Sequence, residues 1–191
     1  YRDQGYLFFN VTPVELTIDG DSVDVEMRMI EGKPATFNNI IINGNTITNE
    51  KVVRRAVFTR PGYLFRQTDF ERSVREIASM GHFDAEYAAD PAKGYALIPN
   101  PMNNTVDITY NVEEKANSQL ELSGGWGNNT FVGTLGVSFN NFSTYNFFRK
   151  EAWRPVPLGD AQQLAIRFQT NGSYYTAFTA SFVEPWLTGK K

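Results

Sequence analysis

The stretch "VDITYNVEEK" (residues 106–115) decides the fold, because a similar stretch occurs earlier in the chain. "VDVEMRMIEGK" (residues 23–33) also begins with Val-Asp, alternates apolar with polar residues, and closes with an acidic residue and Lys. Alternation with a period of two is typical of a β-strand with one buried side. We therefore predict a structural unit that occurs twice and ends, each time, with this strand. The residues expected on the buried side are Val23, Val25, Met27 and Met29 in the first copy and Val106, Ile108, Tyr110 and Val112 in the second.

The residues between the two copies predict a strand and two helices. "FNNIIING" (residues 37–44) is a short β-branched strand that ends at a glycine. Thr48 is the expected N-cap of the first helix, and Pro61-Gly62 is its expected end. "TDFE" (residues 68–71) has the spacing of a capping box, and Gly81 suits the left-handed position after the second helix.

Each copy of the repeated strand is expected to close a β-hairpin. A Gly-aromatic junction, at Gly5-Tyr6 and again at residues 81–83, precedes each hairpin, and residues 19–21 predict a tight turn in the first. The complete unit reads strand–helix–helix–strand–strand, and residues 1–33 read as the tail of an identical unit whose front is missing. We therefore expect the chain to be a piece of a longer protein.

After Lys115 the helical periodicity stops, and four candidate strands follow, each with one apolar face and one polar face. A soluble antiparallel sheet with one solvated face would show this pattern, and so would a transmembrane β-barrel with lipid outside and water inside. Strands of roughly ten residues with aromatic residues near their ends match a barrel wall. The candidate strands are residues 118–127, 130–142, 161–170 and 174–186, and the aromatic residues are Tyr145, Phe147, Phe148, Trp153, Tyr174, Tyr175 and Trp186.

The composition argues against several kinds of chemistry. A net charge of −3 gives no electrostatic case for a nucleic-acid partner, and the absence of cysteine excludes disulfides and thiolate metal sites. The single histidine, His82, stands at the Gly-aromatic junction where the first copy has Tyr6, so it is expected to replace an aromatic residue. We expect no enzyme, and we assign no catalytic, cofactor-binding or metal-binding residue.

The order of the parts resembles the BamA-type outer-membrane assembly proteins, in which polypeptide-transport-associated (POTRA) domains lead into a β-barrel. "FNNIIINGNTITNEKVVRRAV" (residues 37–57) and "RPGYLFRQTDFERSVREIASMGHFD" (residues 60–84) resemble the first strand and the two helices of a POTRA domain. "VDITYNVEEK" resembles the strand that ends the last POTRA domain. "GGWG" (residues 124–127) and "VEPWL" (residues 183–187) resemble the first barrel strand and the end of the fourth.

The resemblance implies a fold class and a domain plan. The fold would be α+β POTRA modules (β-α-α-β-β) followed by antiparallel transmembrane β-barrel strands. Residues 1–33 would be the C-terminal part of the penultimate POTRA domain, residues 34–115 the last POTRA domain, and residues 116–191 the first four barrel strands. Four strands cannot close a barrel, so an open edge is expected. The implied location is the bacterial outer membrane, with the POTRA domains in the periplasm.

The function implied by the resemblance is the folding and insertion of other β-barrel proteins, without ATP or a cofactor. The first barrel strand would act as a lateral gate that adds an incoming strand by β-augmentation. Its glycines either ease opening or merely fit a bend or close packing, and both interpretations stay open. The expected gate residues are Ser118, Leu120, Leu122, Gly124, Gly125, Trp126 and Gly127.

Two further contacts are expected in the last POTRA domain. A strand over residues 83–89, with Phe83, Ala85 and Tyr87, would be an edge that binds extended chains or else only a solvated edge. Arg54 and Arg55 would contact a periplasmic lipoprotein subunit of the assembly complex or else form a solvated basic helix face. The implied partners are unfolded outer-membrane proteins, lipoprotein subunits and outer-membrane lipid.

Three other kinds of protein compete with this interpretation. A translocation or secretion transporter would share the same POTRA–barrel architecture. An outer-membrane phospholipase would place an enzyme domain before a POTRA domain and a barrel. A soluble α/β binding protein followed by a β-sandwich would have the same alternation in residues 116–191.

Overall fold

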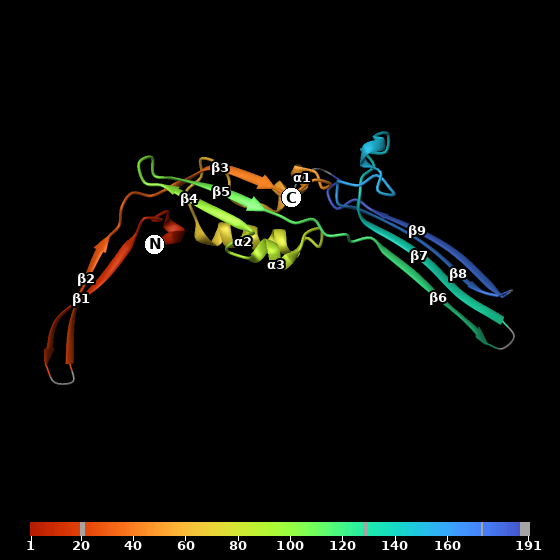
Figure 1. Ribbon diagram of the computed structural model, residues 1–191, viewed down its shortest axis with the longest axis horizontal. Helices are drawn as coiled ribbons and strands as arrows, with labels where there is room; N and C mark the ends of the chain where they lie inside the picture. The colour runs from red at the N-terminus through yellow and green to blue at the C-terminus, as the bar shows by residue number, and fades with distance from the viewer. Residues whose placement is uncertain (20–21, 128–129, 173, 188–191) are drawn as a thin grey trace.

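The computed structural model describes residues 1–19, 22–127, 130–172 and 174–187. These residues form an elongated, bent arrangement of three parts in chain order: a β-hairpin, an α/β unit and a four-stranded sheet (Figure 1). No helix within the described ranges is long and apolar enough to cross a membrane.

The α/β unit is a three-stranded sheet with α2 and α3 along one face (Figure 1). β5 lies in the middle, parallel to β3 and antiparallel to β4. The parallel pairing needs a long crossover, which the helices provide. The bounds are β3 Thr36–Asn43, α1 Glu50–Ala56, α2 Gln67–Ser79, α3 Ala85–Ala89, β4 Tyr95–Asn100 and β5 Thr105–Asn111.

The repeated strand supplies the centre of this unit's core. Val106, Ile108, Tyr110 and Val112 are all buried, which confirms the stripe expected from the alternation. The Tyr110 hydroxyl shares a hydrogen bond of 3.1 Å with the Thr59 hydroxyl, so its one polar group is satisfied inside the core. The other large apolar residues of the core are Phe37, Ile40, Ile42, Val53, Phe65, Phe70, Val74, Ile77 and Phe83.

Neither of the first two helices starts with the predicted side-chain cap. α1 begins after Asn49, and Thr48 gives its backbone N–H to the Glu114 carboxylate at 2.5 Å. The N–H of Thr68 donates to the Asp3 carboxylate at 2.9 Å, so the predicted capping box is wrong. In both places a carboxylate distant in sequence satisfies a free N–H at the start of the helix.

The ends of the two helices agree with the sequence only in part. Gly81 adopts a φ of 73°, as expected for the left-handed position after α2. α1 ends at Ala56, earlier than the Pro61-Gly62 predicted as its end. The chain leaves this helix early because the N–H of Phe58 donates to the Ser73 hydroxyl of α2 at 2.8 Å.

The predicted strand over residues 83–89 is wrong, because residues 85–89 form the short helix α3. Asp84 caps this helix by accepting the N–H of Tyr87 at 2.8 Å. Of the residues assigned to an edge strand, Phe83 is buried in the core, and Ala85 and Tyr87 lie on α3. The outer strands of the sheet are instead β3 and β4.

The N-terminal part is the predicted hairpin, with the short 3-10 helix η1 (Arg2–Gln4) before it. β1 (Asn10–Asp19) pairs antiparallel with β2 (Ser22–Ile30), and the middle of the predicted turn at 19–21 lies outside the described residues. The apolar stripe of β2 is not buried: the exposed fractions of Val23, Val25, Met27 and Met29 are 51, 49, 58 and 58%. The repeated strand is therefore present in both copies, but only the second copy has a core over it.

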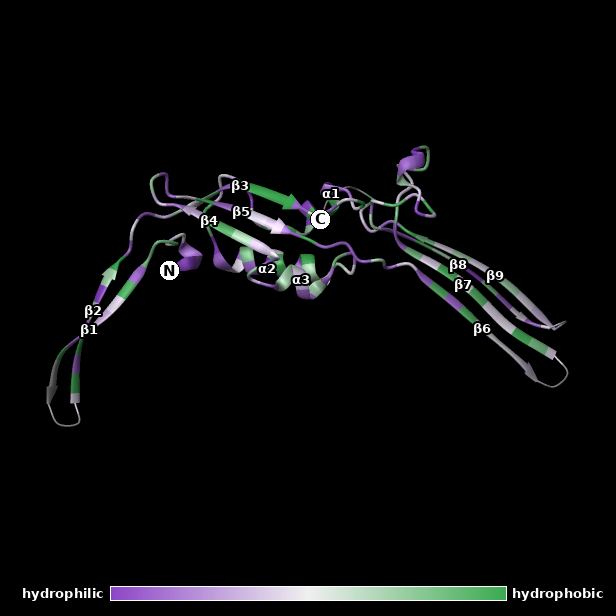
Figure 2. Cartoon of the chain, viewed as in Figure 1, coloured by the Kyte–Doolittle hydropathy of each residue, from purple (hydrophilic) through white to green (hydrophobic). Residues whose placement is uncertain are grey.

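The C-terminal part is a fully antiparallel sheet in the order β6-β7-β8-β9. All four strands predicted after Lys115 are present, with ends within a few residues of those expected. Hydrophobic and hydrophilic residues alternate along them (Figure 2). The bounds are β6 Gln119–Gly127, β7 Thr130–Phe142, β8 Gln162–Asn171 and β9 Tyr175–Val183, with the short 3-10 helix η2 (Lys150–Ala152) between β7 and β8.

Candidate functional site

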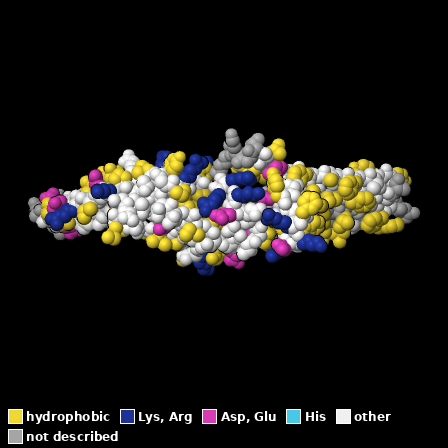
Figure 3. Space-filling model, turned by 90° about the horizontal axis from the view of Figure 1, so that it is seen from above, with side chains coloured by type: hydrophobic (Ala, Val, Ile, Leu, Met, Phe, Trp, Pro, Cys, Tyr) yellow, Lys and Arg dark blue, Asp and Glu magenta, His cyan; other side chains and the backbone are white. Residues whose placement is uncertain are grey.

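The sheet of β6 to β9 presents one apolar face that no described residue covers. Leu122, Leu135, Phe168 and Phe178 form one row across the four strands, and their exposed fractions are 77, 50, 42 and 69%. Figure 3 shows hydrophobic side chains gathered over this end of the molecule. A contiguous apolar face of this kind marks contact with lipid or with another protein. The apolar residues on this face are Leu120, Leu122, Trp126, Phe131, Leu135, Val137, Phe139, Leu164, Ile166, Phe168, Phe178, Ala180 and Phe182.

The strand β6 is an open edge of this sheet. It pairs with β7 from Gln119–Ser138 to Gly127–Thr130, and its other side pairs with no strand of the described residues. All nine residues of β6 are exposed. The backbone N–H and C=O groups that point away from β7 can therefore pair with another strand. The expected gate residues lie on this edge, apart from Ser118, which immediately precedes it.

The glycines of β6 do not have the same surroundings. The ring of Phe131 lies against Gly124 and its partner Gly133, where an added Cβ would come within 3.4 and 2.7 Å of ring carbons. Close packing therefore accounts for Gly133, whereas a Cβ at Gly124 would make an ordinary contact with the ring. Gly125 and Gly127 have no atom within 4 Å of an added Cβ, so packing does not account for them.

On the polar face, one ion pair ties β6 to the third strand. Arg167 of β8 lies 2.7 Å from Glu121 of β6, and the two side chains meet over Gly136 of β7. A side chain at Gly136 would crowd Glu121, since an added Cβ would lie 3.2 Å from a Glu121 oxygen. Both ionic side chains are about half exposed, so the pair contributes about 0.2–1 kcal/mol.

A buried polar cluster, here called the polar joint, connects the sheet to the α/β unit. Its centre is Asp160, whose side chain is 4% exposed. One Asp160 oxygen accepts from the Asn49 amide at 2.7 Å and lies 2.8 Å from the Lys51 ammonium, and the other accepts from the Ser143 hydroxyl. The members of the polar joint are Thr48, Asn49 and Lys51 of the α/β unit and Asn141, Ser143, Gly159 and Asp160 of the sheet.

Two more hydrogen bonds close the polar joint. The Asn141 amide donates to the Thr48 hydroxyl at 2.9 Å, and the N–H of Asn49 donates to the Gly159 carbonyl at 2.8 Å. Burial would raise the pKa of Asp160, but hydrogen bonds from Lys51, Ser143 and Asn49 outweigh it and hold the pKa below its ordinary value. Asp160 is therefore an ionised carboxylate at neutral pH.

Glu114 fixes the loop of residues 46–48, which leads into the polar joint. Its carboxylate accepts the backbone N–H groups of Thr46, Ile47 and Thr48 at 2.5–3.1 Å and the Thr46 hydroxyl at 2.6 Å. Burial acts to raise the Glu114 pKa, but these donors lower it overall. The loop is thus preorganised for its contacts with the sheet.

His82 lies beside Glu114 and holds the segment that leads into β6. The Nδ1 atom of His82 is 2.8 Å from the Asn117 amide nitrogen, and the Asn140 amide donates to the Asn117 carbonyl at 2.7 Å. His82 is buried, and burial lowers its pKa against the opposing effect of the Glu114 charge. It packs in an edge-on contact with Phe83, in line with the aromatic role expected for it.

The two arginines assigned to a partner contact are engaged within the chain. Arg54 pairs with Glu50 on the same helix at 2.6 Å and donates to the Ile40 carbonyl at 3.2 Å. The Arg55 guanidinium lies 5.3 Å from the ring centre of Trp186, just after β9. Arg55 therefore adds a cation–π contact between the α/β unit and the sheet.

The polar joint was not foreseen from the sequence. Its partners are as far apart as Asn49 and Asp160, which are separated by 111 residues. The available signal was local: Asn140-Asn141 and Ser143 interrupt the apolar alternation at the end of β7. Small polar residues at such a point indicate a buried hydrogen-bond network, but they do not identify its partners.

Comparison with known families and proteins agrees with this arrangement. Residues 35–115 match the POTRA family, described as a surface antigen variable number repeat. The outer membrane protein assembly factor BamA of Neorickettsia risticii (strain Illinois) is 28% identical over 142 residues, covering 73% of this chain and 18% of that protein. The factor of the same name from Neisseria meningitidis serogroup B is 27% identical over 140 residues, covering 72% of this chain and 17% of that protein.

A solved structure has the same arrangement of parts. The crystal structure of BamA from Haemophilus ducreyi lacking POTRA domains 1–3 covers 98% of this chain with a TM-score of 0.70 and 17% sequence identity. This chain covers 32% of that one, and it spans less than a fifth of the length of the two relatives above. The likeness supports the fold of the α/β unit followed by antiparallel strands.

Proposed function

We propose that this chain, which belongs to the BamA type of outer-membrane protein and contains a POTRA domain at residues 35–115, is the junction between periplasm and membrane in an assembly factor. Residues 1–33 would end the preceding POTRA domain, residues 34–115 would be the last one, and residues 116–191 would be the first four barrel strands. The chain covers only 17–18% of the relatives named as assembly factors, so the activity of the whole protein is part of the proposal.

The open edge β6 is the observation that supports this function best. An incoming chain that lies beside β6 would satisfy its own N–H and C=O groups and those of the edge. Unpaired backbone groups cost several kcal/mol each in lipid, so strand pairing there is strongly favoured. The uncovered apolar face supports a position of this edge within the lipid, where that cost would apply. Strand pairing makes hydrogen bonds and no covalent bond, so the proposal includes neither ATP nor a cofactor.

The polar joint would hold the POTRA domain at a defined position relative to the edge. It connects α1 of the POTRA domain to the β7–β8 loop, and residues 112–118 continue from β5 directly into β6. An unfolded outer-membrane protein that reaches the POTRA domain would therefore be close to the edge where its strands add.

A periplasmic lipoprotein subunit is the further partner proposed for the POTRA domain. Arg54 has about half of its side chain exposed despite its pairing with Glu50, so it can exchange that partner for a carboxylate on the subunit. Arg55 is a weaker candidate, since its guanidinium lies over Trp186.

Site-specific crosslinking in the full-length protein tests the pairing of β6. Single cysteines at Leu120, Leu122, Gly125 and Gly127 are combined with cysteines in the terminal strand of a stalled substrate barrel protein. We expect disulfides only between positions that belong to one register. A shift along β6 should therefore be matched by an equal shift along the substrate strand, in the same direction for parallel pairing and in the opposite direction for antiparallel pairing.

Matched controls lie on β7, the neighbouring strand that is paired on both sides. Cysteines at Leu135 and Val137 have the same orientation toward the apolar face as those at Leu122 and Leu120. They are expected to form no crosslink with the substrate. Equal crosslinking from β7 and β6, or none along β6, would contradict the proposal.

A further inference from the structure

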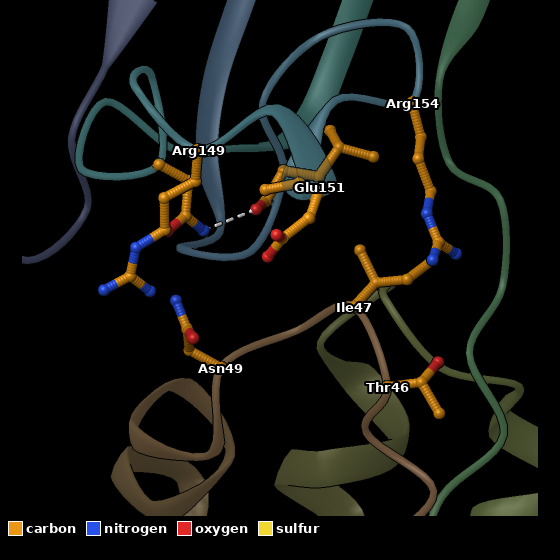
Figure 4. A pocket seen from close by; sticks show the side chains of 9 residues that line it. Thr46, Ile47, Asn49, Arg149, Glu151 and Arg154 are labelled. Atoms are coloured by element: carbon orange, nitrogen blue, oxygen red, sulfur yellow. Dashed lines mark hydrogen bonds between the residues drawn. The ribbon is translucent and has the colours of Figure 1, made fainter.

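A small cavity lies between the β7–β8 loop and the loop of residues 46–49. It has a volume of about 200 Å³, and the side chains around it come from both parts of the molecule (Figure 4). Arg149 and Arg154 stand on opposite sides of it, and Glu151 lies between them, with Asn49 below (Figure 4). The charged side chains thus follow one another as positive, negative and positive.

The charged groups of this cavity are exposed, and no other described residue binds them. Within the described residues, the side chains of Arg149, Glu151 and Arg154 take part in no hydrogen bond or ion pair. The amides beside them are used: the Asn49 amide donates to Asp160 at 2.7 Å, and the Asn146 amide donates to the Leu158 carbonyl at 2.8 Å. The groups left to bind a ligand are therefore two guanidinium groups and one carboxylate.

Exposed aromatic residues occur on the same loop, next to these charges. Phe148 is 93% exposed, and Phe147 packs against it and against Trp153 with ring centres 5.5 and 5.6 Å apart. The loop follows β7 at the end of the sheet that faces the POTRA domain, just beyond Phe139 of the apolar face. Aromatic residues interleaved with arginines at the end of membrane strands are typical of the lipid–water interface.

We infer that this cavity is a binding site for a phospholipid with a phosphoethanolamine headgroup, in the periplasmic leaflet of the membrane. The guanidinium group on one side of Glu151 would bind the phosphate, since its planar fork matches two of the phosphate oxygens. Glu151 would accept hydrogen bonds from the primary ammonium, and the aromatic residues would contact the acyl chains. The volume of about 200 Å³ accommodates a small headgroup.

The charge order makes the site selective among common headgroups. Phosphatidylcholine carries a quaternary ammonium, which has no N–H to donate to Glu151. Phosphatidylglycerol carries no cation, so the carboxylate would face an anionic lipid. The site anchors the POTRA end of the barrel to lipid, and it acts independently of strand pairing at β6.

Native mass spectrometry of the full-length protein, released from detergent, tests this inference. Equal amounts of phosphatidylethanolamine, phosphatidylcholine and phosphatidylglycerol with identical acyl chains are offered together. We expect phosphatidylethanolamine to be retained about tenfold over each of the others, the effect of one charge-assisted hydrogen bond. Equal retention of the three lipids would overturn the proposal.

Variants separate the two halves of the site. Glu151→Gln is expected to abolish the preference over phosphatidylglycerol while lipid is still bound, and Arg149→Gln with Arg154→Gln is expected to reduce retention of all three lipids. Lys93→Gln, at an exposed cation elsewhere on the POTRA domain, is the matched control and should change nothing.

An unchanged preference in Glu151→Gln would refute the role of the carboxylate. Displacement of the lipid by an equal concentration of soluble glycerophosphoethanolamine would refute a lipid ligand.

Discussion

The POTRA domain and the sheet of β6 to β9 use the same alternating pattern with opposite results. In β5 the apolar side chains are covered by helices, and Val106, Ile108 and Tyr110 are at most 1% exposed. In β6 the equivalent positions are covered by no residue that the structure describes, and Leu120 and Leu122 are more than 70% exposed. Alternation therefore determines which face of a strand is apolar, whereas the parts around it determine which solvent that face meets.

The first hairpin sharpens this comparison, because β2 repeats the pattern of β5 almost residue for residue. Its stripe from Val23 to Met29 is about half exposed, although its sequence pattern is that of β5. Helices that would cover it, as α2 covers β5, do not occur within the described residues before β1. The same strand is thus seen once with its core and once without.

The largest expected effect comes from emptying the core of the POTRA domain. Phe65 is fully buried, and Phe65→Ala should lower the free energy of opening of this domain by about 3–5 kcal/mol, from lost burial and the cavity left behind. Hydrogen exchange of the β5 amides in the full-length protein measures this free energy.

Leu122→Ala is the matched change on the uncovered face of the sheet. It should leave the same β5 amides unchanged within about 0.5 kcal/mol, because it is remote from them and has no buried contact. A loss of protection in β5 as large as that from Phe65→Ala would mean that the two parts do not open separately.

An intermediate effect is expected at the polar joint between the two regions. Asp160→Asn removes the negative charge that pairs with Lys51 and accepts the hydrogen bond of Ser143. The loss should lower the free energy that stabilises the polar joint by about 1–3 kcal/mol. Spin labels at Lys93 and Thr179 report the distance between the POTRA domain and the sheet by double electron–electron resonance. We expect a broader distance distribution in Asp160→Asn than in the unmodified protein at neutral pH.

The pH dependence of this joint has a definite sign. The pKa of Asp160 is lowered in the folded protein, so its ionised form stabilises the joint above the ordinary pKa of about 3.9. That contribution is lost as the pH falls through the lowered pKa. Glu114 titrates in the same direction, so the difference between the unmodified protein and Asp160→Asn isolates Asp160. Distributions of equal width at neutral pH would contradict this role.

The smallest effect is expected from a comparison of Gly133, on β7, with Gly125, on the open edge β6. Gly133→Val places a Cβ about where the Phe131 ring lies, and displacing this half-exposed ring should cost about 1 kcal/mol. Gly125→Val meets no neighbour and should be neutral or stabilising within the ~1 kcal/mol range of strand propensities. The temperature at which the full-length protein loses its compact mobility in gel electrophoresis measures both. An equal loss in both variants would show that Gly125 has a conformational role.

Much of this fold could be predicted because its signals are local. The strands of the C-terminal sheet and the buried stripe of β5 follow from period-two alternation, and Gly81 follows from the geometry after a helix. The misses have a common cause. Thr68 and Thr48 lost their expected capping roles to Asp3 and Glu114, which reach them only in the folded chain.

The candidate site was predicted to a similar extent and failed for similar reasons. The edge strand β6 is present where it was expected, but its gate residues remain a prediction until crosslinks are measured. The predicted edge at residues 83–89 is a helix because Asp84 supplies a cap that was read as part of a strand. The polar joint could not be read from one stretch, since it pairs residues about a hundred positions apart.

Among the attachments of the POTRA domain to the sheet, the covalent link and the polar joint serve different strands. Residues 112–118 join it covalently to β6, whereas the polar joint fastens it to the β7–β8 loop. In mechanical terms the polar joint is the fulcrum, the point that stays fixed, and β6 is the strand that a movement of the POTRA domain would pull. A torque on the POTRA domain would appear as shear between β6 and β7, and shear strains all of the ladder hydrogen bonds at once. The glycine-rich end of β6, farthest from the fulcrum, is where the displacement would be greatest.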